Sequence, residues 1–212
     1  MTTILGEEVE EDVEVEESYK NSDNCLIATH IDPGWDAPKQ FRINVKEYLE
    51  EEEYGEFIYV SSPYRNKGSY EGQADQVIES SGGKIGNTEV DEILDRFGSI
   101  THIGAYWCSC HRRTWRDLLK GLYRIEEKRS YTIDMPLHLI TRRIGLASSY
   151  MGHEDEGKDL GADIDIRYDI NQIYKNDLGQ KGEIKRGFLG VELKIQEGSE
   201  PNIVWEITTG SV

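Results

Sequence analysis

Short apolar runs and amphipathic helical segments alternate along the first two thirds of the chain, and this alternation constrains the fold more than any other feature. The apolar runs are short and rich in β-branched residues, which is typical of buried strands. Strands that alternate with helices predict a parallel α/β sheet covered by helices, which we expect over residues 25–145. The predicted strands cover residues 25–31, 56–61 and 100–103, and the helices between the strands cover residues 41–49 and 88–97.

The two flanks of this domain have a different character. Residues 1–24 are strongly acidic, with a run of carboxylates from Glu7 to Glu17, and we expect a flexible tail. Residues 146–212 begin with a polar, glycine-rich stretch and continue with alternating apolar and polar residues, which predicts an antiparallel β-rich extension. The side chains expected to face inward there are Ile164, Ile166, Tyr168, Val191, Leu193 and Trp205.

Charge and composition exclude several classes of function. The formal net charge of the 212 residues is −17, which disfavours binding to nucleic acid backbones and to anionic membrane surfaces. No apolar stretch approaches the length of a membrane span, and the acidic N-terminus lacks the basic region of a secretory signal. Three cysteines form no disulfide framework. We therefore expect a cytoplasmic protein with reduced thiols.

The segment after the third predicted strand places a thiol where it could react. The strand ends at Gly104, a compact turn carries Cys108 and Cys110, and a helix with apolar residues at helical spacing follows. A helix N-terminus favours the thiolate over the thiol, which would make Cys110 a nucleophile. The alternative is a small buried cysteine without chemistry, because free cysteine is among the most buried residue types.

Ligands of open α/β sheets bind at the carboxyl ends of the strands, and three reactive groups are expected there. Asp32 follows the first strand, Cys110 follows the third, and Lys84 lies in a glycine loop before the helix that leads to the third strand. In such a site the carboxylate could accept the thiol proton and the lysine ammonium could stabilise the thiolate. The thiolate could then carry acyl transfer to water. The aromatic residues expected to wall a substrate pocket are Trp35, Tyr106 and Trp107.

Two stretches of the chain resemble the isochorismatase-like cysteine hydrolases. Leu26-Ile-Ala-Thr-His-Ile-Asp32 is similar to the first strand of that family, and Gly104-Ala-Tyr-Trp-Cys-Ser-Cys110 is similar to its turn before the cysteine helix. The resemblance covers residues 25–125. It implies that the α/β domain is a Rossmann-like three-layer sandwich with a parallel sheet, and that Asp32, Lys84 and Cys110 are its catalytic triad. The function it implies is hydrolysis of a small amide or related substrate through a thioester-type intermediate.

A second function stays open beside the hydrolase. Lys84 is shifted from the usual lysine position, near Ser80, and Trp107 replaces a commonly small residue. A catalytically inactive member of the same fold, serving as a structural or assembly subunit, also suits the acidic tail and the β-rich extension. In either case we expect a homo-oligomer whose partner is a small molecule or a protein, with no cofactor and no metal. Cys108-Ser-Cys110-His111 lacks the second pair of ligands that a zinc site needs.

Overall fold

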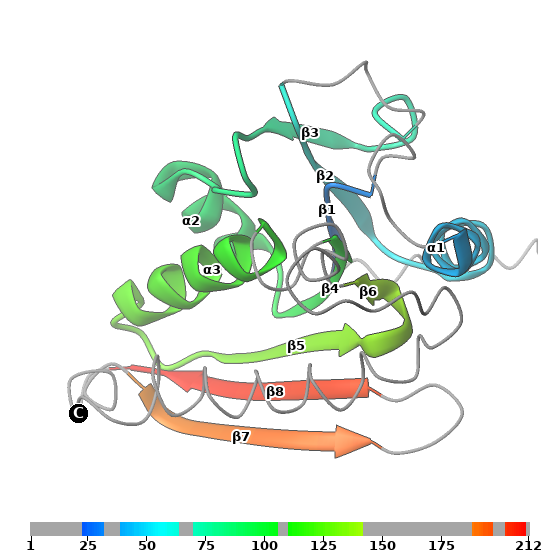
Figure 1. Ribbon diagram of the computed structural model, residues 1–212. Helices are drawn as coiled ribbons and strands as arrows, with labels where there is room; N and C mark the ends of the chain where they lie inside the picture. Colours follow the sequence, from blue (N-terminus) through cyan, green and yellow to red (C-terminus); the bar gives the residue numbers. More distant parts are fainter. Residues whose placement is uncertain are drawn as a thin grey trace, which may run out of the picture.

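The computed structural model describes residues 23–31, 39–63, 70–105, 110–141, 188–196 and 202–210. Its centre is one mixed sheet in the order β3-β2-β1-β4-β5-β8-β7, with the short β6 paired to β4 (Figure 1). The strands are β1 (Asn24–Thr29), β2 (Glu56–Ser61), β3 (Gln76–Glu79), β4 (Ser99–Ala105), β5 (Ser130–Pro136), β6 (Ile140–Thr141), β7 (Phe188–Gln196) and β8 (Asn202–Thr209). The helices are α1 (Lys39–Glu51), α2 (Asn87–Arg96), α3 (Arg112–Arg124) and the 3-10 turn η2 (Leu137–Leu139).

The strands β1, β2 and β4 confirm the expected parallel core. β1 pairs in parallel with β2 on one side and with β4 on the other. Residues of β1 alternate between the two faces of the sheet, and both faces are buried, which is why the strand is a continuous apolar run. Cys25 and Ile27 pack into one core, while Leu26 and Ala28 pack into the other.

Helices cover both faces of the sheet and produce the layered α/β arrangement. α1 lies on one side of the sheet, and α2 and α3 lie on the other (Figure 1). Phe41 and Val45 of α1 pack against the face that carries Leu26 and Phe57. The opposite core is larger, and its helical members are Val90, Ile93, Leu94, Trp115, Leu118, Leu119 and Leu122.

The C-terminal strands are antiparallel, as their alternation predicts, but they extend the central sheet. β8 pairs antiparallel with β5 and with β7, so this part of the 146–212 extension shares the core of the α/β domain (Figure 1). Trp205 is fully buried and its ring lies 5.0 Å from that of Trp115, measured between centroids. Val191 packs at the border of the same core. The expected boundary at residue 145, and Ile164, Ile166 and Tyr168, lie outside the described residues.

Three strands, β3, β5 and the two-residue β6, were not expected from the sequence. β3 is only four residues long and has Val77 exposed at the edge of the sheet, so its pattern resembles a loop. In β5, buried residues alternate with half-buried polar residues such as Thr132 and Asp134, so its sequence is not a continuous apolar run. In the part of the chain that is described, no helix is both long and apolar enough to cross a membrane.

Candidate ligand site at the carboxyl ends of β1 and β4

The strand order reverses between β1 and β4, and the polar core of the protein lies beside this point. From β1 the chain proceeds outward through β2 to β3, and then returns to place β4 on the other side of β1. The loops that leave neighbouring strands at such a reversal diverge, and open α/β sheets bind their ligands there. The segments after β1 and β4, residues 32–38 and 106–109, lie outside the described residues, so the site is built here from its buried floor.

The floor contains a chain of hydrogen bonds that joins β1, β4, α3 and the loop before α2. Thr29 Oγ1 lies 3.2 Å from His102 Nε2 and 3.0 Å from Thr114 Oγ1, and the Thr114 hydroxyl donates to the carbonyl of Gly83 at 2.7 Å. One consistent set of donors is His102 to Thr29, Thr29 to Thr114 and Thr114 to Gly83, with a neutral imidazole. Because these side chains are fully buried, each hydrogen bond offsets a desolvation cost.

Two glycines let the backbone segments of this floor approach each other. Gly104 pairs with Thr29 in the sheet and has φ of 137°, and a Cβ there would collide with the Thr29 backbone. Gly83 has φ of 76°, and a Cβ there would collide with the backbone of Cys110. Both positions require glycine because of the left-handed φ and because of the close contact.

His102 and His111 form a second layer under α3. Their rings are stacked, with centroids 3.7 Å apart and an interplanar angle of 6°, and His111 Nε2 donates to the His102 carbonyl at 3.4 Å. Burial lowers the pKa of His102 well below its ordinary value, and the neighbouring His111 lowers it further. Burial also lowers the pKa of His111 to about 3. Both imidazoles are therefore neutral at physiological pH.

His30 marks the end of β1 with an unusual backbone conformation. Its φ of 51° lies in the left-handed region, which non-glycine residues rarely adopt, and its side chain is buried. The His30 amide donates to Val60 O at 3.0 Å, and the Nε2 atom donates to Ser80 O at 3.4 Å. Burial lowers the pKa of His30. Strained residues of this kind cluster at ligand sites, because the surrounding structure must hold them in place.

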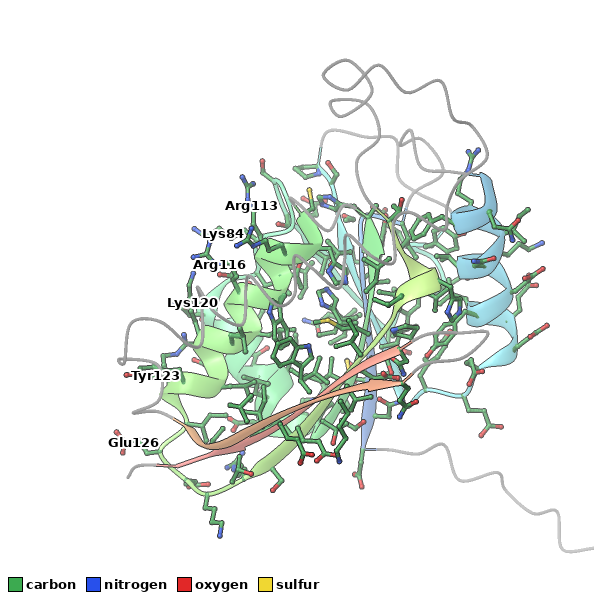
Figure 2. All side chains as sticks on the ribbon, turned by 60° about the horizontal axis from the view of Figure 1, so that its bottom comes forward. Lys84, Arg113, Arg116, Lys120, Tyr123 and Glu126 are labelled. Atoms are coloured by element: carbon green, nitrogen blue, oxygen red, sulfur yellow. The ribbon has the colours of Figure 1, made fainter. Side chains whose placement is uncertain are left out.

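The structure places two of the three predicted catalytic residues. Cys110 is 6% exposed, and only His111 separates it from the first residue of α3. The backbone of Cys110 lies against Gly83. Lys84 follows Gly83, so its backbone lies near Cys110, but its side chain is exposed and extends outward beside Arg113 (Figure 2). Asp32 lies outside the described residues, and so do the expected pocket residues Trp35, Tyr106 and Trp107. The catalytic roles of Asp32, Lys84 and Cys110 stay predictions.

The sequence reasoning missed the buried polar floor. Thr114 and His111 are three residues apart and therefore share the inner face of α3 with Trp115 and Leu118, which is the only local signal for them. Among the described residues, no group of three or more histidine, cysteine, aspartate or glutamate side chains could hold a metal ion.

The sequence matches no protein-family description and no curated protein. Among solved structures, the chain is similar to a mutant of the 16S rRNA (adenine(1408)-N(1))-methyltransferase from Catenulisporales acidiphilia, crystallised with its cosubstrate SAM. The identity is 11%, the TM-score is 0.33, and the match covers 90% of this chain and 86% of the other. A likeness at this level assigns no residue roles and no substrate to this chain.

The comparison overturns the resemblance to isochorismatase-like cysteine hydrolases, because the solved structure that it finds is a methyltransferase. The hydrolase function and its alternative, an inactive member of the same fold acting as a structural subunit, are corrected with it. The resemblance depended on a strand ending at Asp32 and on a glycine turn leading to Cys110. Such strand–turn–helix units recur in parallel α/β proteins of many functions, so the local pattern did not specify the family.

Proposed function

We propose that this protein is a Rossmann-like methyltransferase that binds S-adenosylmethionine at the carboxyl ends of β1 and β4. The observation that carries the proposal is the sheet order. Five parallel strands reverse between β1 and β4, and the antiparallel pair β8 and β7 extends the sheet beyond β5. A mixed sheet of this kind is consistent with a Rossmann-like methyltransferase fold, and the reversal supports a ligand site at β1 and β4.

The sequence after β1 favours S-adenosylmethionine over a dinucleotide. A dinucleotide site uses G-x-G-x-x-G after the first strand, so that the backbone can approach the pyrophosphate. Here the stretch from His30 to Trp35 has a single glycine, Gly34. S-adenosylmethionine has no phosphate, and its sulfonium is positively charged, which suits a chain with a net charge of −17.

The strained backbone of His30 has a role in the proposed site. A left-handed residue costs of order 1–3 kcal/mol and persists only where the fold over-determines it. His30 is held by hydrogen bonds to Val60, which lies on the neighbouring strand β2, and to Ser80, which directly follows β3. This arrangement fixes the direction in which the chain leaves β1 toward the proposed site. When bound, S-adenosylmethionine would supply a methyl group for displacement from its sulfonium by a nucleophilic atom of the substrate.

The test is equilibrium binding to the full chain by isothermal titration calorimetry. We expect saturable 1:1 binding of S-adenosylmethionine and of its demethylated product, S-adenosylhomocysteine, and no binding of NAD. Absence of saturable binding of both adenosyl ligands would refute the proposal. Binding of NAD in their place would identify a dinucleotide site and would refute it as well.

A pair of variants connects the binding to this end of the sheet. Glycine adopts a left-handed φ without strain, but His30→Gly also removes a buried ring and its hydrogen bond to Ser80. The variant should therefore be less stable than the parent and bind S-adenosylmethionine at least about tenfold more weakly. Lys194→Ala is the control, because Lys194 is an exposed residue of β7 that pairs with Glu206. Equal affinities in His30→Gly, Lys194→Ala and the parent would remove His30 from the proposed site.

A further inference from the structure

The strand β7 forms one outer edge of the sheet and is long for that position. It covers Phe188–Gln196, whereas β3, the strand at the opposite edge, covers only Gln76–Glu79 (Figure 1). In the part of the chain that the structure describes, β7 pairs with β8 on one side and with no strand on the other. An edge strand of this length presents a row of backbone N–H and C=O groups to which another strand can bind.

The backbone of β7 is regular over most of its length. The register between β7 and β8 shifts between Phe188 and Gly190, and from Gly190 to Gln196 each residue pairs in order with a residue of β8. This stretch contains no proline, so every residue in it has an N–H group to donate. The stretch from Gly190 to Gln196 can therefore form a regular ladder of hydrogen bonds with an added strand.

Opposite charges alternate on one face of β7. Glu192 and Lys194 are exposed and are separated by one residue, so both lie on the face away from the core against which Val191 packs. On β8, Glu206 lies directly opposite Glu192 in the register, and its carboxylate lies 2.5 Å from the Lys194 ammonium. Like charges that oppose each other in a sheet are destabilising, so this face favours a further cation beside Glu192.

We infer that β7 binds β7 of a second copy of this chain as an antiparallel pair, with a two-fold axis that passes at position 193. In this register Glu192 lies opposite Lys194 of the second copy, and Lys194 lies opposite Glu192 of the second copy. The sheets of the two copies become one continuous sheet across the contact. A two-fold dimer is the commonest assembly of identical chains, because each copy contributes the same surface.

Charge and backbone regularity select this register among those that two-fold symmetry allows. Opposed residues of an antiparallel pair point to the same face, so an axis perpendicular to the sheet must pass at a residue and not between two residues. An axis at Glu192 or at Lys194 would place two like charges directly opposite each other. An axis at position 193 forms two ion pairs instead, and it matches Gly190 with Gln196, so the contact uses only the regular part of β7.

A second copy fits this edge because the charge pattern of β7 is complementary to itself. The net charge of −17 repels another copy at a distance, but at physiological ionic strength the Debye length is only about 8 Å, so the repulsion is largely screened before contact. The strands β5 and β8 separate β7 from β4. The dimer therefore leaves the carboxyl ends of β1 and β4 accessible and does not depend on the proposed methyltransferase function.

Sedimentation equilibrium of the full chain, at an ionic strength of about 0.15 M, tests the inference. We expect the parent to dimerise. Glu192→Lys places a lysine opposite Lys194 of the second copy, and Lys194→Glu places a glutamate opposite Glu192 of the second copy. Each variant alone should therefore dimerise at least about tenfold more weakly than the parent. An equimolar mixture of the two variants should form a heterodimer about as tightly as the parent dimerises, because every opposed pair again has opposite charges.

An exposed ion pair on α1 supplies the matched control. Glu50→Lys and Lys46→Glu change the net charge by the same amounts as the β7 variants, and both should dimerise as the parent does. Lys194→Glu also breaks the ion pair with Glu206, whereas Glu192→Lys retains it and changes only the opposed charges. Far-UV circular dichroism shows that each variant is folded, and recovery of the dimer in the mixture shows the same for β7 itself.

Three results would overturn the inference. The first is a parent chain that stays monomeric at every concentration measured. The second is a Glu192→Lys variant that dimerises as tightly as the parent, which would place the contact on another surface. The third is a mixture of the two β7 variants that associates as weakly as each variant alone, which would show that the opposed charges do not set the register.

Discussion

The imidazole rings of His102 and His111 stack face to face, 3.7 Å apart between centroids, in a site where both side chains are completely buried. Their pKa values are lowered by burial, for His111 to about 3. An unfolded chain would protonate both rings below the ordinary histidine pKa of about 6.5. The native state therefore binds fewer protons than the unfolded state in mildly acidic solution.

We expect the free energy of unfolding to decrease as the pH falls from about 6.5 toward 3. His111 alone should contribute a loss of about 2 kcal/mol between pH 7 and pH 5. Urea unfolding at a series of pH values measures this loss. His111→Phe should flatten the dependence, because it removes one of the buried histidines whose pKa is lowered in the folded protein. A parent protein equally stable at pH 5 and pH 7 would contradict the prediction.

The hydroxyl of Thr114 should be worth more than its methyl group. The hydroxyl bridges Thr29 and Gly83, and Thr114→Val would leave the Gly83 carbonyl and Thr29 hydroxyl without this partner. We expect Thr114→Val to lower the free energy of unfolding by about 1–3 kcal/mol. Thr114→Ser keeps the hydroxyl and should cost less than about 1 kcal/mol. Chemical denaturation distinguishes the two, and a serine variant as unstable as the valine variant would show that packing dominates.

The C-terminal strand β8 should be indispensable to the core rather than an addition to it. Trp205 is fully buried against Trp115, and we expect Trp205→Ala to cost about 3–5 kcal/mol. Val204 lies on the other face of β8 and is half-buried, so Val204→Ala should cost only about 1 kcal/mol. Thermal unfolding of both variants makes the comparison. Similar losses in the two variants would mean that β8 contributes little to the common core.

The sequence by itself determined which segments become the central strands. β1 is buried on both faces and is a nearly continuous apolar run, and β4 contains the β-branched residues from Ile100 to Ile103, so both strands can be recognised without knowing their neighbours. The same reasoning located α3, because Trp115, Leu118 and Leu122 mark one helical face. The antiparallel character of β8 was visible for a related reason, since alternate residues are buried.

Only the tertiary structure decided how these pieces combine. Nothing in the pattern of β8 specifies that it pairs with β5, because pairing depends on residues distant in the chain; this pairing turned a predicted extension into part of the central sheet. The stacking of His102 on His111 and the outward direction of Lys84 have the same origin. Local spacing predicts which residues share a face, whereas burial, partners and side-chain direction arise when distant segments pack together.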